Sequence, residues 1–281
     1  MNGRARLARI WLCADDYGIS PGVNRAIRDL FKRGRLNATS VMVVGPAVGN
    51  HEISALKVAA GSSKRRAIGL HATLTAPFRP LSMHFRPLDG GRFPRLPKMF
   101  SLGLARRLDC EIVQAEVKLQ LAAFSEMFGR APDFVDGHQH VQLFPVVRDA
   151  FLHAVKEAAP QAWVRQAGRS SGLASRLTAP KAIFLDILSA QLRTRAGRLG
   201  MAVNPAFAGA YDFSGRPDFD SLMRRFLDGL PEGGVVMCHP GFVDEILVSL
   251  DPFTFQRERE HAFLAGDQFA ALLEESHVTL G

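Results

Sequence analysis

Apolar runs alternate with amphipathic stretches along most of the chain, and this order predicts strands that are each followed by a helix. Residues 8–14 (ARIWLCA) have the pattern of a buried strand, which ends in Asp15-Asp16-Tyr17-Gly18, where the chain must turn. A helix is predicted directly afterwards, because Ser20 suits an N-cap and Pro21 the first helical position. Apolar residues at helical spacing then continue as far as Gly34.

The same alternation recurs to the C-terminal end. It predicts strands at 38–45, 67–74, 133–138, 162–166 and 234–238, and helices near 47–60, 106–128, 146–158, 178–196, 218–229 and 256–275. The segments 75–101 and 197–217, rich in Pro, Gly and aromatic residues, interrupt this rhythm and are predicted to be long functional loops. Strands that alternate with helices form parallel sheets covered by those helices. A chain of 281 residues suits a single α/β barrel, so we expect one domain over 1–281.

Composition excludes several classes of protein. With 47% apolar and 22% charged residues, the chain is neither disordered nor collagen-like nor a coiled coil. No apolar run approaches the ~18 residues needed to cross a bilayer. The apolar run near the start is too short for a secretory signal, so we expect a cytoplasmic protein. Its three cysteines, without a CxxC motif, are expected to be reduced thiols.

The formal net charge of +8 changes this picture little. The basic residues are scattered in twos and threes, and no nucleic-acid-binding motif is visible, so we expect no nucleic-acid partner. The basic excess would suit peripheral contact with an anionic membrane, at its inner face. A homodimer is a further expectation, because small enzymes are often symmetric.

Polar residues of one kind follow the predicted strands. Asp15-Asp16, His71, His138 and His239 each come at the end of an apolar run. The carboxyl ends of strands in a parallel α/β barrel open on one face, so these side chains are expected to converge. One carboxylate and two imidazoles can hold a divalent ion and leave a position open for water. The sequence therefore predicts a hydrolytic metal site.

The roles within this set are only partly determined by spacing. Adjacent residues in a strand point to opposite sides, so one of Asp15 and Asp16 is expected to bind metal while the other takes a proton from water. His239 has the chemistry of an acid that protonates a leaving group. Spacing leaves open which of His138 and His140 is the ligand, since both lie on one face of an extended segment. We favour His140 as a residue that orients a ligand or a substrate hydroxyl.

Four segments together resemble a known family. CADDYGISPGVN (13–24), IGLHATLT (68–75), DGHQHVQLFP (136–145) and MCHPGF (237–242) are similar, in order and spacing, to motifs of the YdjC-like carbohydrate deacetylases. That family includes chitooligosaccharide deacetylases and hopanoid-associated deacetylases. The resemblance implies a distorted (β/α) barrel that uses one divalent cation to remove an N-acetyl group from an amino sugar.

Matched motif by motif, the resemblance implies a role for each candidate residue. Asp15 corresponds to the catalytic base and His239 to the general acid. The metal ligands implied are Asp16, His71 and His138. This ligand set favours zinc by ligand softness, although magnesium, cobalt and manganese are also candidate metals.

The substrate that we expect is an N-acetylated amino sugar, either on a glycolipid such as an N-acetylglucosaminyl hopanoid or in a chitooligosaccharide. His140, Arg165 and Tyr211 are expected to contact it, together with the long segments 75–101 and 197–217. Two other hypotheses are a metal-dependent phosphoesterase and a non-catalytic relic that binds membrane or sugar. Release of phosphate without acetate would indicate the first, and absence of a stoichiometric ion the second.

Overall fold

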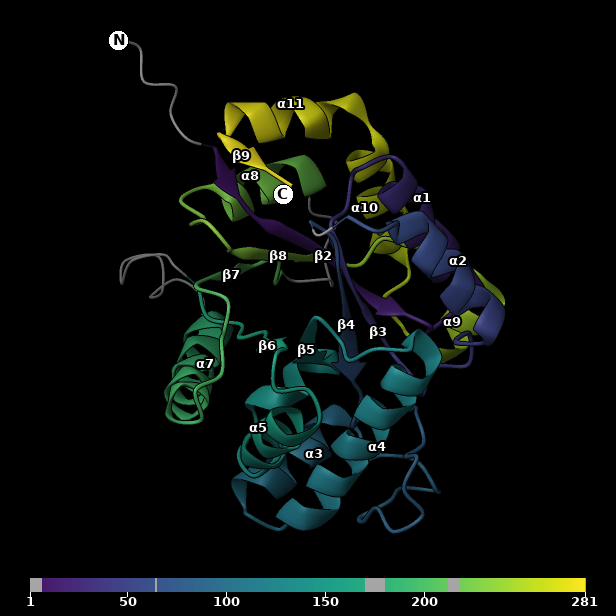
Figure 1. Ribbon diagram of the computed structural model, residues 1–281, viewed down its shortest axis with the longest axis vertical. Helices are drawn as coiled ribbons and strands as arrows, with labels where there is room; N and C mark the ends of the chain where they lie inside the picture. Colours follow the sequence, from purple (N-terminus) through teal and green to yellow (C-terminus); the bar gives the residue numbers. More distant parts are fainter. Residues whose placement is uncertain (1–6, 64, 170–179, 212–217, 281) are drawn as a thin grey trace.

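The computed structural model describes residues 7–63, 65–169, 180–211 and 218–280. Within these residues, seven parallel strands form one curled sheet in the order β6-β5-β4-β3-β2-β8-β7 (Figure 1). The strands are β2 (Trp11–Tyr17), β3 (Ala38–Val41), β4 (Ala67–Ala72), β5 (Phe134–Gly137), β6 (Trp163–Val164), β7 (Phe207–Ala208) and β8 (Val235–Cys238).

Backbone hydrogen bonds join the two edges of this sheet through the segment that precedes β7. The Val164 N–H donates to the carbonyl of Ala202 (2.9 Å), and the Phe207 N–H donates to the carbonyl of Gly168 (3.0 Å). The edge strands are therefore connected without a continuous ladder between them. The predicted fold class, an α/β protein with parallel strands in a distorted barrel, is confirmed.

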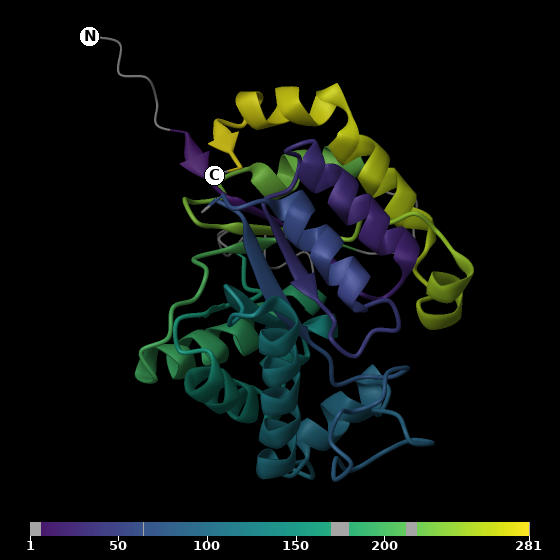
Figure 2. The ribbon, with the colours of Figure 1, turned by 45° about the vertical axis from the view of Figure 1, so that its right-hand side comes forward.

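Helices cover the outside of the curled sheet. Figures 1 and 2 show α1, α2 and α10 together along one side, and α3, α4 and α5 below the strands. The helices are α1 (Pro21–Lys32), α2 (Asn50–Ala60), α3 (Leu96–Leu104), α4 (Cys110–Phe128), α5 (Val147–Ala158), α7 (Pro180–Arg198), α8 (Phe219–Leu227), α9 (Glu245–Leu250), α10 (Phe255–Ala265) and α11 (Asp267–Glu275), with a 3-10 helix η1 (His138–Leu143). With helices outside and side chains filling the interior, the central strands are buried on both faces.

The first helix forms as its sequence predicts. The Ser20 side chain caps α1 by accepting a hydrogen bond from the Val23 N–H (3.2 Å), and Pro21 occupies the first turn. The apolar stripe, which includes Val23 and Leu30, is fully buried against the sheet. Local sequence thus fixes where the chain turns after β2.

Several predicted boundaries are wrong. The segment 75–101, predicted to be a loop, contains most of α3, because Pro97 lies in the first turn, where a missing N–H costs nothing. The segment 197–217 contains β7, and its residues 212–217 lie outside the described residues. The predicted helix at 256–275 is divided into α10 and α11, since Gly266 adopts an extended backbone.

Two short strands near the ends of the chain pair outside the main sheet. β1 (Ala8–Arg9) and β9 (Val278–Thr279) form a parallel two-stranded sheet, which brings the beginning and the end of the described chain together (Figure 1). Within the described ranges, each helix is too short or too polar to cross a bilayer.

Candidate metal and catalytic site

An irregularity at the end of β2 lets both aspartates reach one place. The register with β3 shifts between Ala14 and Tyr17, and Asp16 has a positive φ of 68°. This turn breaks the alternation of side chains that a regular strand would impose. As a result, Asp16 Oδ1 and Asp15 Oδ2 lie 3.4 Å and 4.0 Å from the same atom, His71 Nε2. The strand predicted to end at residue 14 therefore continues to Tyr17, with an irregularity at Asp16 inside it.

Asn24 holds the chain that follows this irregularity. Its Oδ1 accepts a hydrogen bond from the Gly18 N–H (2.6 Å), and its Nδ2 donates to the carbonyl of Ala47 (2.8 Å). The side chain is fully buried, so both hydrogen bonds are shielded from water. The polar residues that follow Asp15-Asp16 in the motif therefore fix the backbone that aims the carboxylates.

His71, in β4, is oriented by partners on both neighbouring strands. Its Nδ1 lies 2.6 Å from Asp136 Oδ1 and 3.1 Å from Ser40 Oγ, which leaves Nε2 directed at Asp16. Burial alone would lower the pKa of His71, but the charges of Asp136 and Asp15 outweigh it and raise this pKa to about 10. The surroundings therefore favour positive charge at this imidazole. A bound cation would supply such a charge.

His138 lies immediately after β5 and completes a three-residue group. Its Nδ1 is 3.1 Å from Asp16 Oδ1 and 3.3 Å from His71 Nε2. The ring of Phe78 packs edge-on against it, with the ring centroids 5.8 Å apart. The imidazole is thus held between an aromatic wall and the other two residues.

The chemistry and spacing of this group fit one small cation. Metal–ligand distances of about 2.0–2.2 Å place neighbouring ligand atoms roughly 3.0–3.6 Å apart. The three atoms of Asp16, His71 and His138 are separated by 3.1–3.4 Å. Two imidazole nitrogens and one carboxylate oxygen suit zinc better than magnesium or manganese, which prefer oxygen ligands. The donor set therefore fits the divalent cation expected from the sequence.

A second group of candidate ligands, made by Cys13, Asp15 and Asp136, already contains a cation of the protein's own. Arg165 Nη1 and Nη2 each lie 2.6 Å from an oxygen of Asp15, and Nη1 lies 2.9 Å from Asp136 Oδ2. The guanidinium is fully buried, and it also lies over the ring of Phe207. Its positive charge faces both carboxylates, so we assign no metal to this second group.

The ion pair with Arg165 keeps Asp15 ionised. Burial would raise the pKa of Asp15, but the positive charges of Arg165 and then His71 outweigh it and hold this pKa below its ordinary value. A carboxylate held in one orientation beside the three-residue group is suited to accept a proton there.

His140 lies near the group but outside it. It adopts a left-handed backbone conformation (φ 57°), as does Gln139, which is uncommon for two successive residues other than glycine. Its Nδ1 is buried and makes no hydrogen bond to any described residue. Burial, followed by the charge of Arg165, lowers the pKa of His140 to about 3, so its imidazole is neutral. The structure brings His138 to Asp16 and His71, and the substrate role of His140 stays a prediction.

His239 follows β8, which pairs in register with β2, so it comes at the same level of the sheet as Asp15. Its backbone N–H donates a hydrogen bond to the carboxylate of Glu260, which also accepts one from the Tyr211 hydroxyl. The predicted substrate contacts of Arg165 and Tyr211 stay predictions, since both polar groups are engaged with carboxylates.

Several residues of this site were not predicted from the sequence, among them Asp136 and Arg257. Asp136 orients His71. Its position two residues before His138 places both side chains on one face of a strand, and this spacing could have identified Asp136. Arg257 Nη2 lies 2.6 Å from Asp16 Oδ2, although these residues are 241 positions apart. No motif or spacing in the sequence connects them.

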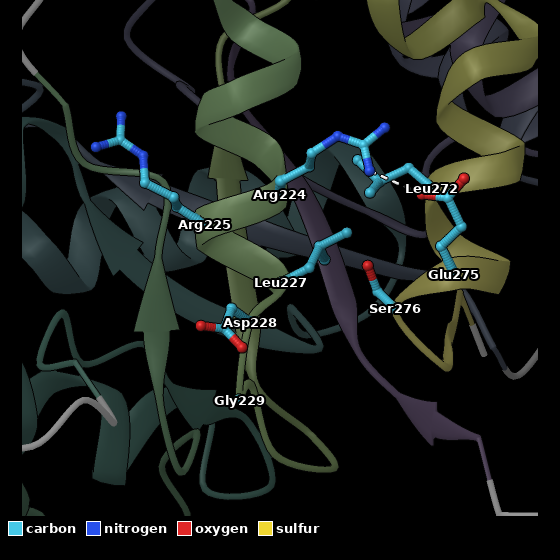
Figure 3. A pocket seen from close by; sticks show the side chains of 8 residues that line it. All are labelled: Arg224, Arg225, Leu227, Asp228, Gly229, Leu272, Glu275 and Ser276. Atoms are coloured by element: carbon cyan, nitrogen blue, oxygen red, sulfur yellow. Dashed lines mark hydrogen bonds and ion pairs between the residues drawn. The ribbon is translucent and has the colours of Figure 1, made fainter.

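Two hollows on the described surface lie away from this site. One, of about 570 Å³, opens between α8 and α11 and is lined by residues that include Arg224, Arg225 and Glu275 (Figure 3). The other, of about 330 Å³, surrounds Trp11 and Trp163. Neither hollow includes a candidate ligand, so the site is recognised from its polar geometry.

Comparison with known proteins shows which family the chain belongs to. The model of the YdjC-like protein family matches residues 9–275. The chain belongs to this family. A carbohydrate deacetylase of Mus musculus is 30% identical over 251 residues, which is 83% of this chain and 78% of that protein. A chitooligosaccharide deacetylase of Salmonella schwarzengrund is 27% identical over 245 residues, which is 83% of this chain and 82% of that protein.

Solved structures show the same fold. A proposed cellobiose-phosphate cleavage protein of Enterococcus faecalis superposes with a TM-score of 0.76 at 22% identity, over 98% of this chain and 97% of that one. The lactam utilization protein of Thermus thermophilus gives a TM-score of 0.53 at 17% identity, over 96% of this chain and 98% of that one. At these identities, the comparison concerns the fold alone.

Proposed function

We propose that this YdjC-like protein is a metal-dependent carbohydrate deacetylase that removes the N-acetyl group from an amino sugar. The observation that carries the proposal is the group formed by Asp16, His71 and His138, with the ion-paired carboxylate of Asp15 beside it. The names of the curated relatives supply the substrate class.

We assign the cation to Asp16 Oδ1, His71 Nε2 and His138 Nδ1. A divalent ion held there would lower the pKa of a water molecule and polarise the acetamido carbonyl. Asp136 fixes the tautomer and orientation of His71 through its 2.6 Å contact with Nδ1, as carboxylates do for metal-binding histidines.

The proton transfers are assigned to two side chains of this protein. Asp15, ionised by its pairing with Arg165, accepts a proton from the water that attacks the acetamido carbon. His239 donates a proton to the amine nitrogen as the carbon–nitrogen bond breaks. The products are acetate and a free amino sugar, and one water is consumed.

For the substrate we favour a glycolipid, such as an N-acetylglucosaminyl hopanoid, because the net charge of +8 would suit work at an anionic membrane face. A chitooligosaccharide is the other candidate, and it is the substrate named for one of the curated relatives. Both offer the same acetamido group to the site.

The deciding experiment measures acetate released by the purified protein, loaded separately with Zn²⁺, Co²⁺, Mn²⁺ or Mg²⁺. Diacetylchitobiose and an N-acetylglucosaminyl glycolipid in detergent serve as substrates, and a phosphomonoester serves as the comparison. Acetate from either sugar supports the proposal, and their relative rates identify the substrate. Phosphate release without acetate, or no turnover by the metal-loaded protein, would overturn it.

The base assignment has a test of its own. Asp15→Asn keeps the shape of the side chain but removes the proton acceptor, so we expect the rate to fall by at least about 10²-fold. Bound metal, measured after equilibrium dialysis, should remain stoichiometric. Undiminished turnover in this variant would remove Asp15 from the role of base.

A further inference from the structure

Helix α10 carries none of the motifs that identify the site, yet it contacts the site at several points. Arg257 and Glu260 are three residues apart on this helix, a spacing that places both side chains on one face. Both are buried, with 3% and 0% of their surfaces exposed. Buried charges of this kind are costly unless they are paired, so their partners are informative.

The first contact is made by the Arg257 side chain. One nitrogen, Nη2, lies 2.6 Å from Asp16 Oδ2 and also 2.6 Å from Asp251 Oδ2. The other oxygen, Asp16 Oδ1, is the one that lies 3.1 Å from His138 Nδ1. The Arg257 guanidinium therefore binds one oxygen of Asp16, the proposed metal ligand. The other oxygen of Asp16 is directed at His71 and His138.

The remaining contacts hold the loop that contains His239. The Glu260 carboxylate accepts a hydrogen bond from the His239 N–H, and the carbonyl of Arg257 accepts one from the Gly241 N–H (3.0 Å). A Cβ at Gly241 would lie 3.3 Å from Arg257 Cβ and 2.9 Å from Val23 Cγ2, so only glycine allows this close packing. The Tyr211 hydroxyl donates to the other oxygen of Glu260.

We propose that α10 is the positioning element of the site, in which Arg257 restricts Asp16 to coordination through a single oxygen while Glu260 sets the position of His239. This inference rests on the proposed function. Single-oxygen coordination leaves more of the cation's coordination sphere for water and substrate than a carboxylate that chelates through both oxygens. Arg257 and Glu260 act through Asp16 and His239, so they are positioning residues.

The proposal predicts separable effects of the two residues. Arg257→Met should weaken Co²⁺ binding by about 10–100-fold, the usual cost of losing a partner of a metal ligand. Arg257→Lys should recover much of that affinity, because a single nitrogen makes both contacts in the native protein. Arg259→Met, which removes the same charge from an exposed position on α10, should leave affinity unchanged.

Glu260→Gln should act on turnover instead. It removes one acceptor, so the His239 loop is expected to shift, and displacement of a catalytic group by ~1 Å can lower kcat by about 10²-fold. Its Co²⁺ affinity and KM should remain those of the wild type. Tyr211→Phe, which leaves the carboxylate in place, should give a smaller decrease in kcat in the same direction.

The measurements are Co²⁺ dissociation constants by competition with a chromophoric chelator, the absorption spectrum of bound Co²⁺, and kcat and KM for acetate release. Wild-type affinity and spectrum in Arg257→Met would overturn the role of Arg257, and unchanged kcat in Glu260→Gln would overturn that of Glu260. Should Arg257→Met fail to fold, Arg257→Lys and Asp251→Asn decide: at least one must change the Co²⁺ affinity or spectrum. Wild-type protein that releases no acetate, combined with weakened Co²⁺ binding in Arg257→Met, would refute the proposed function and retain the role of Arg257.

Discussion

Each of the adjacent aspartates belongs to a buried cluster built around one arginine. The first cluster consists of Asp15, Asp136 and Arg165, and the second of Asp16, Asp251 and Arg257. Arg165 engages both oxygens of Asp15 at 2.6 Å and also contacts Asp136. Arg257 engages only one oxygen of Asp16 and shares the same nitrogen with Asp251. The first cluster is fully enclosed, whereas Asp251 is partly exposed.

This difference explains how neighbouring residues of one type can have distinct proposed roles. A carboxylate paired through both oxygens is fixed and ionised. Each oxygen keeps a second lone pair that can accept a proton, but neither oxygen is free of a cation, as a metal ligand would be. A carboxylate paired through one oxygen keeps its other oxygen available to bind a metal ion. The environment of each aspartate, and not its identity, therefore separates the proposed base from the proposed ligand.

The largest effect on metal binding should come from removing Asp16 Oδ1, the carboxylate oxygen that Arg257 does not contact. Asp16→Ala is expected to lose stoichiometric metal, with a decrease in affinity beyond the ~10–100-fold cost of losing a supporting partner. Metal content after dialysis, measured by plasma mass spectrometry, checks this, with Asp15→Asn as the matched variant. Equal metal retention by Asp16→Ala and Asp15→Asn would contradict the contrast between the two aspartates.

The enclosed cluster should matter most for stability. Arg165→Met leaves two buried carboxylates without their cation and should lower the free energy of unfolding by about 3–5 kcal/mol. Arg257→Met should cost less, because Asp251 can reach water. Denaturant titration gives both values, and Arg130→Met, in an exposed pair with Asp133, is the control, expected to cost about 0–1 kcal/mol. A greater loss in Arg257→Met would reverse the comparison.

Removing the carboxylate of Asp136, which supports His71, should have a smaller effect on metal binding than removing Asp16. Asp136→Asn should weaken metal binding by about 10–100-fold, since the carboxylate that orients the imidazole is lost. Ser40→Ala removes the longer contact at 3.1 Å and should have less effect. Competition titrations rank the two variants, and unaltered affinity in Asp136→Asn would show that His71 needs no such support.

The smallest effect is expected from a change at Tyr17, the last residue of β2. The Tyr17 hydroxyl donates to the carbonyl of Glu52 (2.7 Å), at a distance from the ligand atoms. Tyr17→Phe should lower the free energy of unfolding by about 0.5–1.5 kcal/mol. Metal affinity should not change. A weakened metal site in this variant would mean that the support of Asp16 extends further than the two arginine clusters.

Much of the fold could be predicted from local sequence. Alternation of apolar and amphipathic stretches identified the strands of the main sheet except β7, and Ser20 with Pro21 marked the start of α1. Predictions were poorer where the chain has few periodic residues. α3 lies in a proline-rich segment, and the short α9 (Glu245–Leu250) was not predicted at all.

The sequence by itself determined that one carboxylate pair and several histidines would meet, because they follow strands that end at one face of a parallel sheet. Only the tertiary structure decided which atoms face one another. The turn at Asp16 depends on a register shift with β3, and the pairings of Asp15 with Arg165 and of Asp16 with Arg257 join residues 150 and 241 positions apart. Such contacts depend on the direction of each side chain in the folded protein, which a strand or helix pattern does not encode.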